Sequence, residues 1–325
     1  MAVTFPSDKA CLVGHTGFVG SALLRQTDFA SLYNSQNING IAGQSYDTVI
    51  CAAAPGSMFE ANNQPEQDRA KVHQLIEHLA SVSAQNFVLV SSIAVLADFA
   101  GGDDETTDRF QTALAYGRHR RELEAFVETH FANHLIVRLP ALFGEGLRKN
   151  FIFDLLNPVP TMLTAEKFES LGEALDATLA ETVREMYTRN PANGMFVLDR
   201  PALSRNSHRA ALENAVEQSG FSATQFHHRD TTYQYYGIDR LWGDIGIAVS
   251  AGLSHIHLVS EPLAAHVIHD RLTGRPMPET TARLHREDMR TRHAGLWGES
   301  GPYLSDSATT LDRLAAFYCV QKAAA

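Results

Sequence analysis

Three glycines, Gly14, Gly17 and Gly20, directly follow a short apolar run at residues 9–13 and lead into a helical pattern at 18–25. Glycine adopts backbone angles that other residues avoid, so this spacing permits a tight turn from a strand into a helix. The N–H groups and dipole at the start of a helix attract an anion such as a pyrophosphate. The turn therefore predicts the phosphate-binding corner of a dinucleotide fold.

The composition is that of a globular chain. Among 325 residues, 44% are hydrophobic and 20% are charged, which excludes disordered and fibrous classes. No stretch approaches the ~20 apolar residues of a membrane span, and the first ten residues lack the layout of a secretory signal. The formal net charge of -10 disfavours binding to nucleic-acid phosphates. We expect a cytoplasmic protein that binds a small molecule and neither nucleic acid nor membrane.

Cysteine and histidine give no sign of a disulfide framework or a metal site. The three cysteines, Cys11, Cys51 and Cys319, are scattered, and the first two lie in apolar runs that predict buried thiols. The 15 histidines show no recognisable spacing for a third metal ligand. We therefore expect no bound metal.

Strand-length apolar runs alternate with helical patterns through the first half of the chain. The runs lie at 31–33, 48–54, 86–91 and 134–139, and the helical patterns at 68–81 and 116–129. This alternation predicts an α/β protein with a Rossmann-type, doubly wound parallel sheet. Only a short segment with Gly40 and Gly43 separates the second and third runs, so we expect a loop where a helix usually stands.

The pattern changes after residue 157. Helical periods at 165–188 and 208–218 flank a short apolar run at 195–198, which predicts a smaller, mostly helical region. Strand character at 233–236 and 255–259, with a helix at 238–250 between them, predicts one more crossover of the sheet, and we expect two helical stretches around 283–294. The predicted domains are a dinucleotide-binding domain at 1–157 plus about 230–260, and a substrate-binding region at about 158–229 plus 261–325.

The end of the second predicted strand bears on the choice of cofactor. An acidic residue there accepts the ribose hydroxyls of NAD and repels the 2′-phosphate of NADP. This chain has Tyr33-Asn34-Ser35-Gln36, with neither a carboxylate nor an arginine. Both NAD and NADP stay open, and His15 or Arg25 offers positive charge to a phosphate.

Three motifs resemble the extended short-chain dehydrogenase/reductase family of the NAD-dependent epimerase/dehydratase type. They are the glycine turn, Ser91-Ser92 at the end of an apolar strand, and Tyr116-Gly117-Arg118-His119-Arg120 at the start of a helix. Residues 137–144, followed by Lys149-Asn150-Phe151, are similar to its nucleotide-sugar epimerases and dTDP-4-dehydrorhamnose reductases. The resemblance covers 9–157 and extends weakly over 233–262, while 158–232 has no counterpart.

The resemblance implies roles for individual residues. Tyr116 would exchange a proton with a substrate oxygen, and Ser92 would hydrogen-bond that oxygen. Arg120 stands where the family has lysine; it supplies charge and donors, yet it cannot relay protons at neutral pH. The implied cofactor residues are Gly14, His15, Thr16, Gly17, Phe18, Val19, Gly20, Asn34, Ser35, Ala53, Tyr116, Arg120 and Leu139, and the implied substrate residues are Ser92, Lys149 and Asn150.

The leading hypothesis is an NAD(P)-dependent oxidoreductase or epimerase that acts on a nucleotide-linked sugar or a similar polar hydroxy or keto substrate. One alternative, motivated by Arg120, is a dinucleotide-binding regulator or scaffold without turnover. Another is a ketoreductase of a non-sugar natural product, with the helical region forming the pocket. The analogy with the family also suggests a homodimer.

Overall fold

The computed structural model describes residues 9–324, and the chain divides into two compact units. The first unit runs to Leu147 and also takes Thr232–Leu263 and Arg286–Leu314; the second comprises Arg148–Thr231, Ala264–His285 and the end of the chain from Ala315. Residues 286–314, predicted for the substrate-binding region, thus pack in the first unit. Residues 1–8 and 325 of the predicted domains lie outside the described part.

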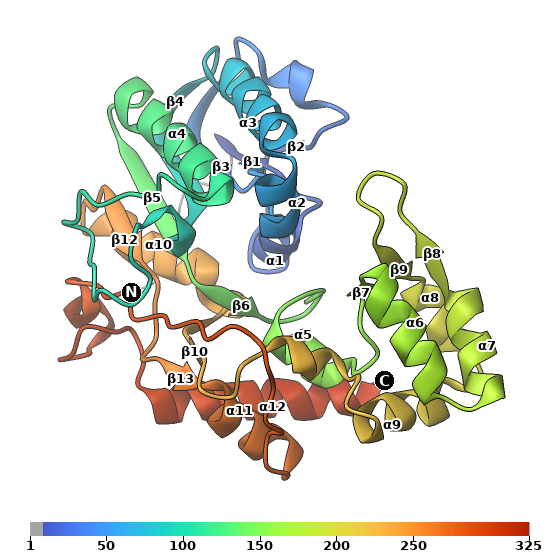
Figure 1. The fold of residues 1–325 in the computed structure, drawn as a ribbon. Coiled ribbons are helices and arrows are strands. Elements are labelled where there is room, and N and C mark those ends of the chain that lie inside the picture. The colour runs from blue at the N-terminus through green and yellow to red at the C-terminus, as the bar shows by residue number, and fades with distance from the viewer. Residues whose placement is uncertain (1–8, 325) are drawn as a thin grey trace. The chain divides into compact units, whose positions relative to one another are not determined.

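A six-stranded parallel sheet forms the centre of the first unit, in the order β12-β5-β4-β3-β1-β2 (Figure 1). Its strands are β1 (Ala10–Val13), β2 (Ser31–Tyr33), β3 (Ser45–Cys51), β4 (Ser83–Ser92), β5 (His134–Leu139) and β12 (His255–His257). The first strand, β1, lies inside the sheet, with β2 next to it at one edge. The later strands β3, β4, β5 and β12 then follow one another on the other side of β1. This order confirms the predicted doubly wound, Rossmann-type sheet.

Helices cover both faces of this sheet, because successive strand residues point to opposite sides. On one face, Leu12 and its alternate neighbours pack with α1 (Phe18–Leu24) and α10 (Leu241–Ser250). On the other face, Cys11 and its neighbours pack with α3 (Pro65–Leu79) and α4 (Ala115–His130), which Figure 1 shows side by side. Shorter connections are η2 (Ile38–Ile41), α2 (Met58–Asn63), η3 (Ile93–Val95) and η5 (Ile238–Arg240). The single turn η2 replaces a full helix between β2 and β3, as predicted.

The predicted crossover from residues 233–236 into the main sheet is wrong. β11 (Tyr235–Gly237) pairs instead with β6 (Ala141–Phe143) in a separate two-stranded sheet, and only β12 joins the main one. Pro140 lies between β5 and β6 and has no N–H to donate, so the ladder of β5 ends there. A further small sheet joins β10 (Thr232–Tyr233) to β13 (Leu263–Ala264).

The prediction of two helical stretches around 283–294 is also wrong. This segment is irregular up to a single turn, η6 (Ala294–Trp297). Its N–H groups bond to other segments: Met289 N donates to Gln234 Oε1 at 2.8 Å, and Arg290 N donates to Asp103 O at 2.9 Å. Tertiary hydrogen bonds therefore override the local helical pattern. The helices of the C-terminal part are α11 (Ala265–Thr273) and α12 (Ser307–Ala324).

The second unit combines short helices with a small antiparallel sheet of β7 (Met162–Leu163), β9 (Phe196–Leu198) and β8 (Tyr187–Arg189). The predicted helix at 165–188 is two helices, because Asp176 caps a new start by accepting a hydrogen bond from Leu179 N at 2.9 Å. The helices are α5 (Phe151–Leu156), α6 (Ala165–Ala174), α7 (Ala177–Met186), α8 (Arg200–Arg205), α9 (Arg209–Gln218) and η4 (Ala223–Phe226). Leu171, Val183 and Leu212 belong to their shared apolar core.

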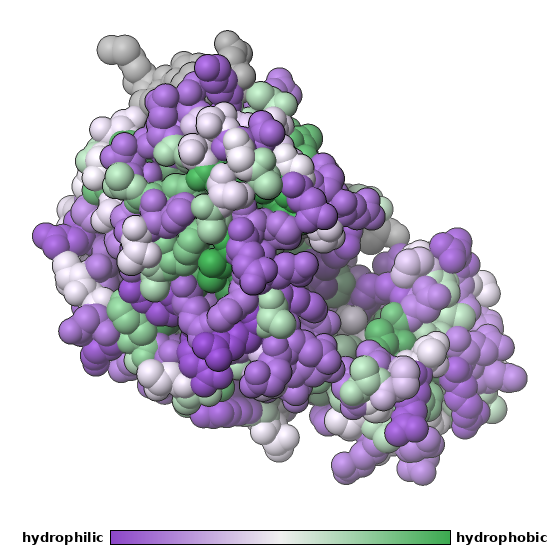
Figure 2. Space-filling model, turned by 90° about the horizontal axis from the view of Figure 1, so that it is seen from above, coloured by the Kyte–Doolittle hydropathy of each residue, from purple (hydrophilic) through white to green (hydrophobic). Residues whose placement is uncertain are grey.

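Residues 9–324 bear on the expectations about cysteines, membrane spans and metal sites. Cys11 and Cys51 are buried, as predicted, and Cys319 is exposed. Within this range no helix has the length and apolar character needed to cross a bilayer, and no three metal-binding side chains cluster. The face seen in Figure 2 is mainly hydrophilic, with small hydrophobic patches between the polar residues.

Candidate active site

The glycine turn leaves no room for side chains at its two ends. Gly14 has φ of +93°, and a Cβ there would lie 2.6 Å from Ala52 O. A Cβ on Gly20 would collide with the carbonyl oxygen of Gly14. Gly17 caps α1 without a side-chain hydrogen bond. The turn is therefore a bare backbone cradle of the kind that a pyrophosphate requires.

The end of β2 is tied to this cradle. Gly14 N donates to Tyr33 O at 2.7 Å, and the His15 Nδ1 atom lies 3.0 Å from the same oxygen, so this ring nitrogen carries a hydrogen. Asn34 closes the following turn, since its Oδ1 accepts from Gln36 N at 2.8 Å and its N–H donates to Asn37 Oδ1 at 2.7 Å. Amide groups thus stand where NAD-specific folds carry an acid.

The carboxyl ends of the neighbouring strands bring other predicted residues to the same edge. Ala53 follows the end of β3, and its Cα would lie 2.8 Å from a Cβ on Gly14. Ser92 ends β4, and its register partner Leu139 ends β5. Open α/β sheets bind their ligands at this edge.

The start of α4 is held against the end of β4. Asn62 Oδ1 accepts from Tyr116 N at 3.0 Å, and Gln111 Oε1 accepts from the N–H groups of Ala113 and Leu114 at 2.9 and 3.1 Å. Gly117 faces η3 so closely that an added Cβ would overlap the carbonyl oxygen of Ala94. This close approach brings the Tyr116 hydroxyl into the surroundings of Ser92, which acts on the pKa of the phenol.

The environment of Tyr116 acts on its pKa in both directions. Burial raises the pKa of the phenol, the charge of Arg120 and the hydrogen bond with Ser92 lower it, and the nearby charge of Asp68 raises it. The net effect is a pKa above the usual value. The phenol is therefore protonated at neutral pH and can serve as a proton donor.

Arg120 is buried beside the tyrosine, with its guanidinium carbon 4.0 Å from the centre of the Tyr116 ring. Asp68 binds it in a bidentate manner: Nη1 lies 2.5 Å from Oδ2 and Nη2 lies 2.9 Å from Oδ1. Nη2 also donates to Pro55 O, and Nη1 to Tyr116 O at 3.3 Å. The remaining donor, Nε, is buried without a hydrogen-bond partner in the described part of the chain.

Residues 28–159, which include Ser92, Tyr116 and Arg120, match the model of the NAD dependent epimerase/dehydratase family. The matched segment covers less than half of the 325-residue chain. No curated protein matches the sequence at a significant level.

Solved structures with the same fold extend over nearly the whole chain. A dTDP-4-dehydrorhamnose reductase from Clostridium acetobutylicum is 15% identical with a TM-score of 0.58, over 96% of this chain and 99% of that one. A UDP-N-acetylglucosamine 4-epimerase from Methanobrevibacter ruminantium is 10% identical with a TM-score of 0.60, over 96% and 97%. RMD from Pseudomonas aeruginosa, solved with NADPH, is 14% identical with a TM-score of 0.60, over 98% and 100%. At such identities the likeness establishes the fold.

Sequence reasoning missed Asp68. Asp68 is 6% exposed and lies on the buried side of α3 with Val72, Leu75 and Leu79. The spacing of these four residues is that of one helix face, so the sequence held a signal. A carboxylate within an apolar face needs a buried cation, and Arg120 provides it.

Two predicted substrate residues, Lys149 and Asn150, belong to the second unit. Lys149 is exposed. Asn150 has φ of 112° and caps α5, since its Oδ1 accepts from Ile152 N at 3.0 Å and Phe153 N at 3.2 Å. A contact of either residue with substrate stays a prediction.

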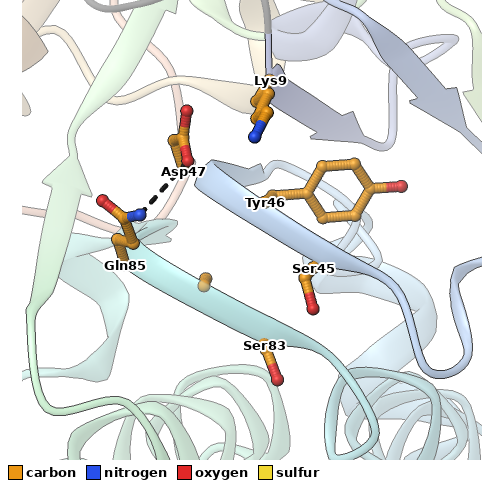
Figure 3. Close-up of a pocket in the computed structure, with 7 residues that line it drawn as sticks. Lys9, Ser45, Tyr46, Asp47, Ser83 and Gln85 are labelled. Atoms are coloured by element: carbon orange, nitrogen blue, oxygen red, sulfur yellow. Dashed lines mark hydrogen bonds between the residues drawn. The ribbon is translucent and has the colours of Figure 1, made fainter.

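One surface pocket of the first unit is separate from the candidate active site. It measures about 340 Å³ and is lined by Lys9 and by the first residues of β3 and β4, among them Asp47 and Gln85 (Figure 3). Gln85 Nε2 donates to Asp47 Oδ1 at 3.3 Å across its wall. Because β3 and β4 begin here and end at Cys51 and Ser92, this cavity lies at the opposite edge of the sheet from the active-site residues.

The two adjacent serines of β4 have different surroundings. Ser91 Oγ donates to Glu124 Oε1 at 2.6 Å, and Glu124 is fully buried and also accepts from Arg138 Nη2 at 2.8 Å. Ser92 Oγ accepts from Ala94 N at 3.1 Å and lies at Tyr116. Ser91 therefore serves the buried ion pair, whereas Ser92 lies on the side of Tyr116.

We expect Ser91→Ala to lower the free energy of unfolding by about 1.5–3 kcal/mol, because it removes a hydrogen bond to a buried charge. Its kcat should stay close to that of the wild type. Ser92→Ala should lower kcat about tenfold, the worth of one neutral hydrogen bond, and should cost less stability than Ser91→Ala, about 0.5–1.5 kcal/mol, because it removes the neutral hydrogen bond from Ala94 N. Urea unfolding and initial rates, measured on both variants, check this. Equal effects of the two substitutions would contradict the assignment.

Proposed function

We propose that the protein is an NAD(P)-dependent oxidoreductase or epimerase with Tyr116 as its acid/base group. The observation that carries this proposal is the arrangement at the end of β4, where Tyr116 meets Ser92 and stacks on Arg120. The glycine cradle of the same unit lies at the same edge of the sheet. A proton donor beside a dinucleotide cradle suits hydride chemistry.

The cofactor that fits is NAD or NADP. The bare backbone at Gly14 and Gly20 suits a pyrophosphate, with Thr16, Phe18 and Val19 completing the turn. Neutral amides at Asn34 and Gln36 leave both dinucleotides possible, and Ser35 offers a hydroxyl to either. The unpartnered Nε of Arg120 is a donor available to the nicotinamide ribose.

When bound, a nicotinamide supplies or accepts the hydride. The residues of this chain hold the reacting oxygen: Tyr116 Oη exchanges a proton with it, and Ser92 Oγ donates a hydrogen bond that fixes it next to the phenol. Arg120 holds positive charge next to the ring and keeps the tyrosine oriented. Ala53 and Leu139 would line the floor of the nicotinamide site.

The substrate class that we propose is a nucleotide-linked sugar or a similar polar hydroxy or keto compound. It is supported by the solved structures with this fold, which include a dTDP-4-dehydrorhamnose reductase and a UDP-N-acetylglucosamine 4-epimerase. Lys149 and Asn150 of the second unit are the proposed contacts to the substrate, with Lys149 suited to a diphosphate.

The test is to mix the protein with NADH or NADPH and a panel of nucleotide-linked 4-keto sugars. We expect the reduced-nicotinamide absorbance to fall with at least one pair. Product analysis of nucleotide sugars incubated with oxidised cofactor detects epimerisation, which leaves the absorbance unchanged. Cofactor binding without any product in either assay would contradict the proposal.

The absence of turnover would favour a dinucleotide-binding regulator or scaffold. One observation speaks for this second candidate: the four terminal N–H groups of Arg120 are engaged by Asp68, Pro55 and Tyr116. An arginine held in this way has one donor left for a cofactor, which weakens the case for efficient hydride transfer. Calorimetric titration with each dinucleotide would show binding in both cases, so product formation decides.

A further inference from the structure

The buried pair of Asp68 and Arg120 joins α3 to α4 beneath the candidate acid/base group. Both side chains are almost fully buried, with 6% and 2% of their surface exposed. The contact is bidentate, a geometry that arginine forms with a carboxylate and lysine does not. Hydrogen bonds from Arg120 and His119 hold the pKa of Asp68 below its usual value although burial raises it. The carboxylate is therefore ionised.

Two neighbouring side chains also lie at this pair. His119 Nδ1 lies 2.7 Å from Asp68 Oδ2, and His119 Nε2 lies 3.4 Å from Arg118 Nη2. The single negative charge of Asp68 thus offsets the single positive charge of Arg120, and the Tyr116 ring rests on a neutral pair. Arg118 is exposed, so solvent screens its charge.

We propose, resting on the function proposed above, that Asp68 is a positioning residue. It fixes Arg120 under Tyr116 and offsets the charge of Arg120. This arrangement sets the site for reduction of a carbonyl substrate, with Tyr116 as the proton donor. An unbalanced cation at this place would favour the phenolate, the form needed to take a proton from a hydroxyl group. Because Asp68 offsets the charge of Arg120, the pair stabilises the phenolate much less than an unpaired cation would. Oxidation and epimerisation, which both begin with removal of a hydroxyl proton, are then disfavoured relative to reduction.

The proposed step balances as follows. A substrate carbonyl carbon gains a hydride from the reduced nicotinamide, which is thereby oxidised, and the C=O double bond becomes a single bond. The carbonyl oxygen gains the proton that Tyr116 Oη releases, so the product is an alcohol. The tyrosine regains a proton from water before the next turnover.

The test is the pH profile of kcat for NADH- or NADPH-dependent reduction in the wild type and in Asp68→Asn. Tyr116 must be protonated to donate, so the rate falls as the pH rises through its pKa. Removing the Asp68 charge lowers that pKa, so we expect the alkaline limb to move to lower pH by about one unit. Loss of packing alone would lower kcat at every pH and leave the limb in place.

Glu122→Gln is the matched control. Glu122 also joins α3 to α4, through Arg69 Nε and His73 Nε2 at 3.1 Å each, and these hydrogen bonds do not involve Tyr116 or Arg120. This substitution removes the same charge from the same helix pair, and we expect no displacement of the alkaline limb. Should Asp68→Asn fail to fold, Asp68→Glu retains the charge with a longer side chain. It should keep the limb of the wild type while changing kcat.

A second readout does not depend on turnover. NMR titration of protein with ¹³C-labelled tyrosine rings follows the ionisation of Tyr116, whose signal is assigned by its loss in Tyr116→Phe. A titration midpoint that falls in Asp68→Asn supports the proposal, and a midpoint unchanged in the folded variant overturns it. Epimerisation by the wild type without any reduction would overturn the assigned direction and leave the proposed function standing. Absence of dinucleotide binding would instead remove the proposed function itself.

Discussion

Tyr116→Phe should lower kcat by about 10²–10⁴-fold, the usual contribution of a positioned general acid or base. The substitution removes one oxygen and keeps the ring that packs on the Arg120 guanidinium. Dinucleotide affinity should therefore change little, since the glycine cradle and the Arg120–Asp68 pair stay in place. Initial rates with the substrate found active, together with calorimetric titration of the cofactor, check both parts of this expectation.

Tyr46→Phe provides the matched control for that experiment. The Tyr46 hydroxyl lies 2.9 Å from that of Tyr33, and burial with this hydrogen bond raises its pKa to about 12. Tyr46 belongs to the first residues of β3, at the edge of the sheet opposite to Ser92. The Tyr46→Phe variant should be somewhat less stable than the wild type and should keep the kcat of the wild type. A Tyr116→Phe variant as active as the wild type would remove Tyr116 from the mechanism.

The sheet could be predicted because its signals are local. A buried strand followed by Gly14, Gly17 and Gly20 needs little more than its own residues to form the turn, as the close contacts of Gly14 and Gly20 show. The strands of the sheet are short apolar runs separated by helical periods, and such patterns depend on side-chain type alone. Even the shortened connection at η2 was visible, because too few residues separate β2 from β3 for a full helix.

The features that escaped prediction depend on contacts between distant segments. Residues 283–293 have a helical period, but the acceptors for their N–H groups lie on Gln234 and on the loop containing Asp103. Likewise, β6 pairs with β11 from far along the chain, and nothing near residue 141 specifies that partner. A periodicity argument sees only neighbours in sequence, so it predicted helices around 283–294 and placed the strand at 233–236 in the wrong sheet.

The candidate site also combines residues with local sequence signals and residues that depend on distant contacts. Motif order predicts Ser92 and Tyr116 as site residues, and Ser92 is among the groups that act on the pKa of Tyr116. The replacement of a lysine by Arg120 remained unexplained at that stage, because its partner Asp68 lies 52 positions earlier. The bidentate pair supplies a physical reason: a buried guanidinium requires an anion that matches its planar geometry. Arg120 and Asp68 are therefore best understood as one unit.

Gly117→Ala should also reduce activity strongly, although residue 117 touches no substrate. Its Cβ would overlap the carbonyl oxygen of Ala94 and lie 2.9 Å from both Cβ and Cγ of Gln111. The side chain of Gln111 has some freedom, but Ala94 O is backbone, so α4 must move away from η3. Tyr116 then separates from Ser92, and a misplacement of about 1 Å costs about 10²-fold in rate.

Gly243→Ala distinguishes this effect from that of any helical glycine. Gly243 lies in α10 of the same unit with open space around the position of an added Cβ. This substitution should be neutral or stabilise the protein by about 0.4–1 kcal/mol, since alanine restricts the unfolded chain and favours a helix. Thermal unfolding and kcat, measured for both variants, give the comparison. If Gly117→Ala keeps its kcat, the close approach of α4 to η3 has no part in placing Tyr116, and the site must owe its geometry to the caps from Asn62 and Gln111 instead.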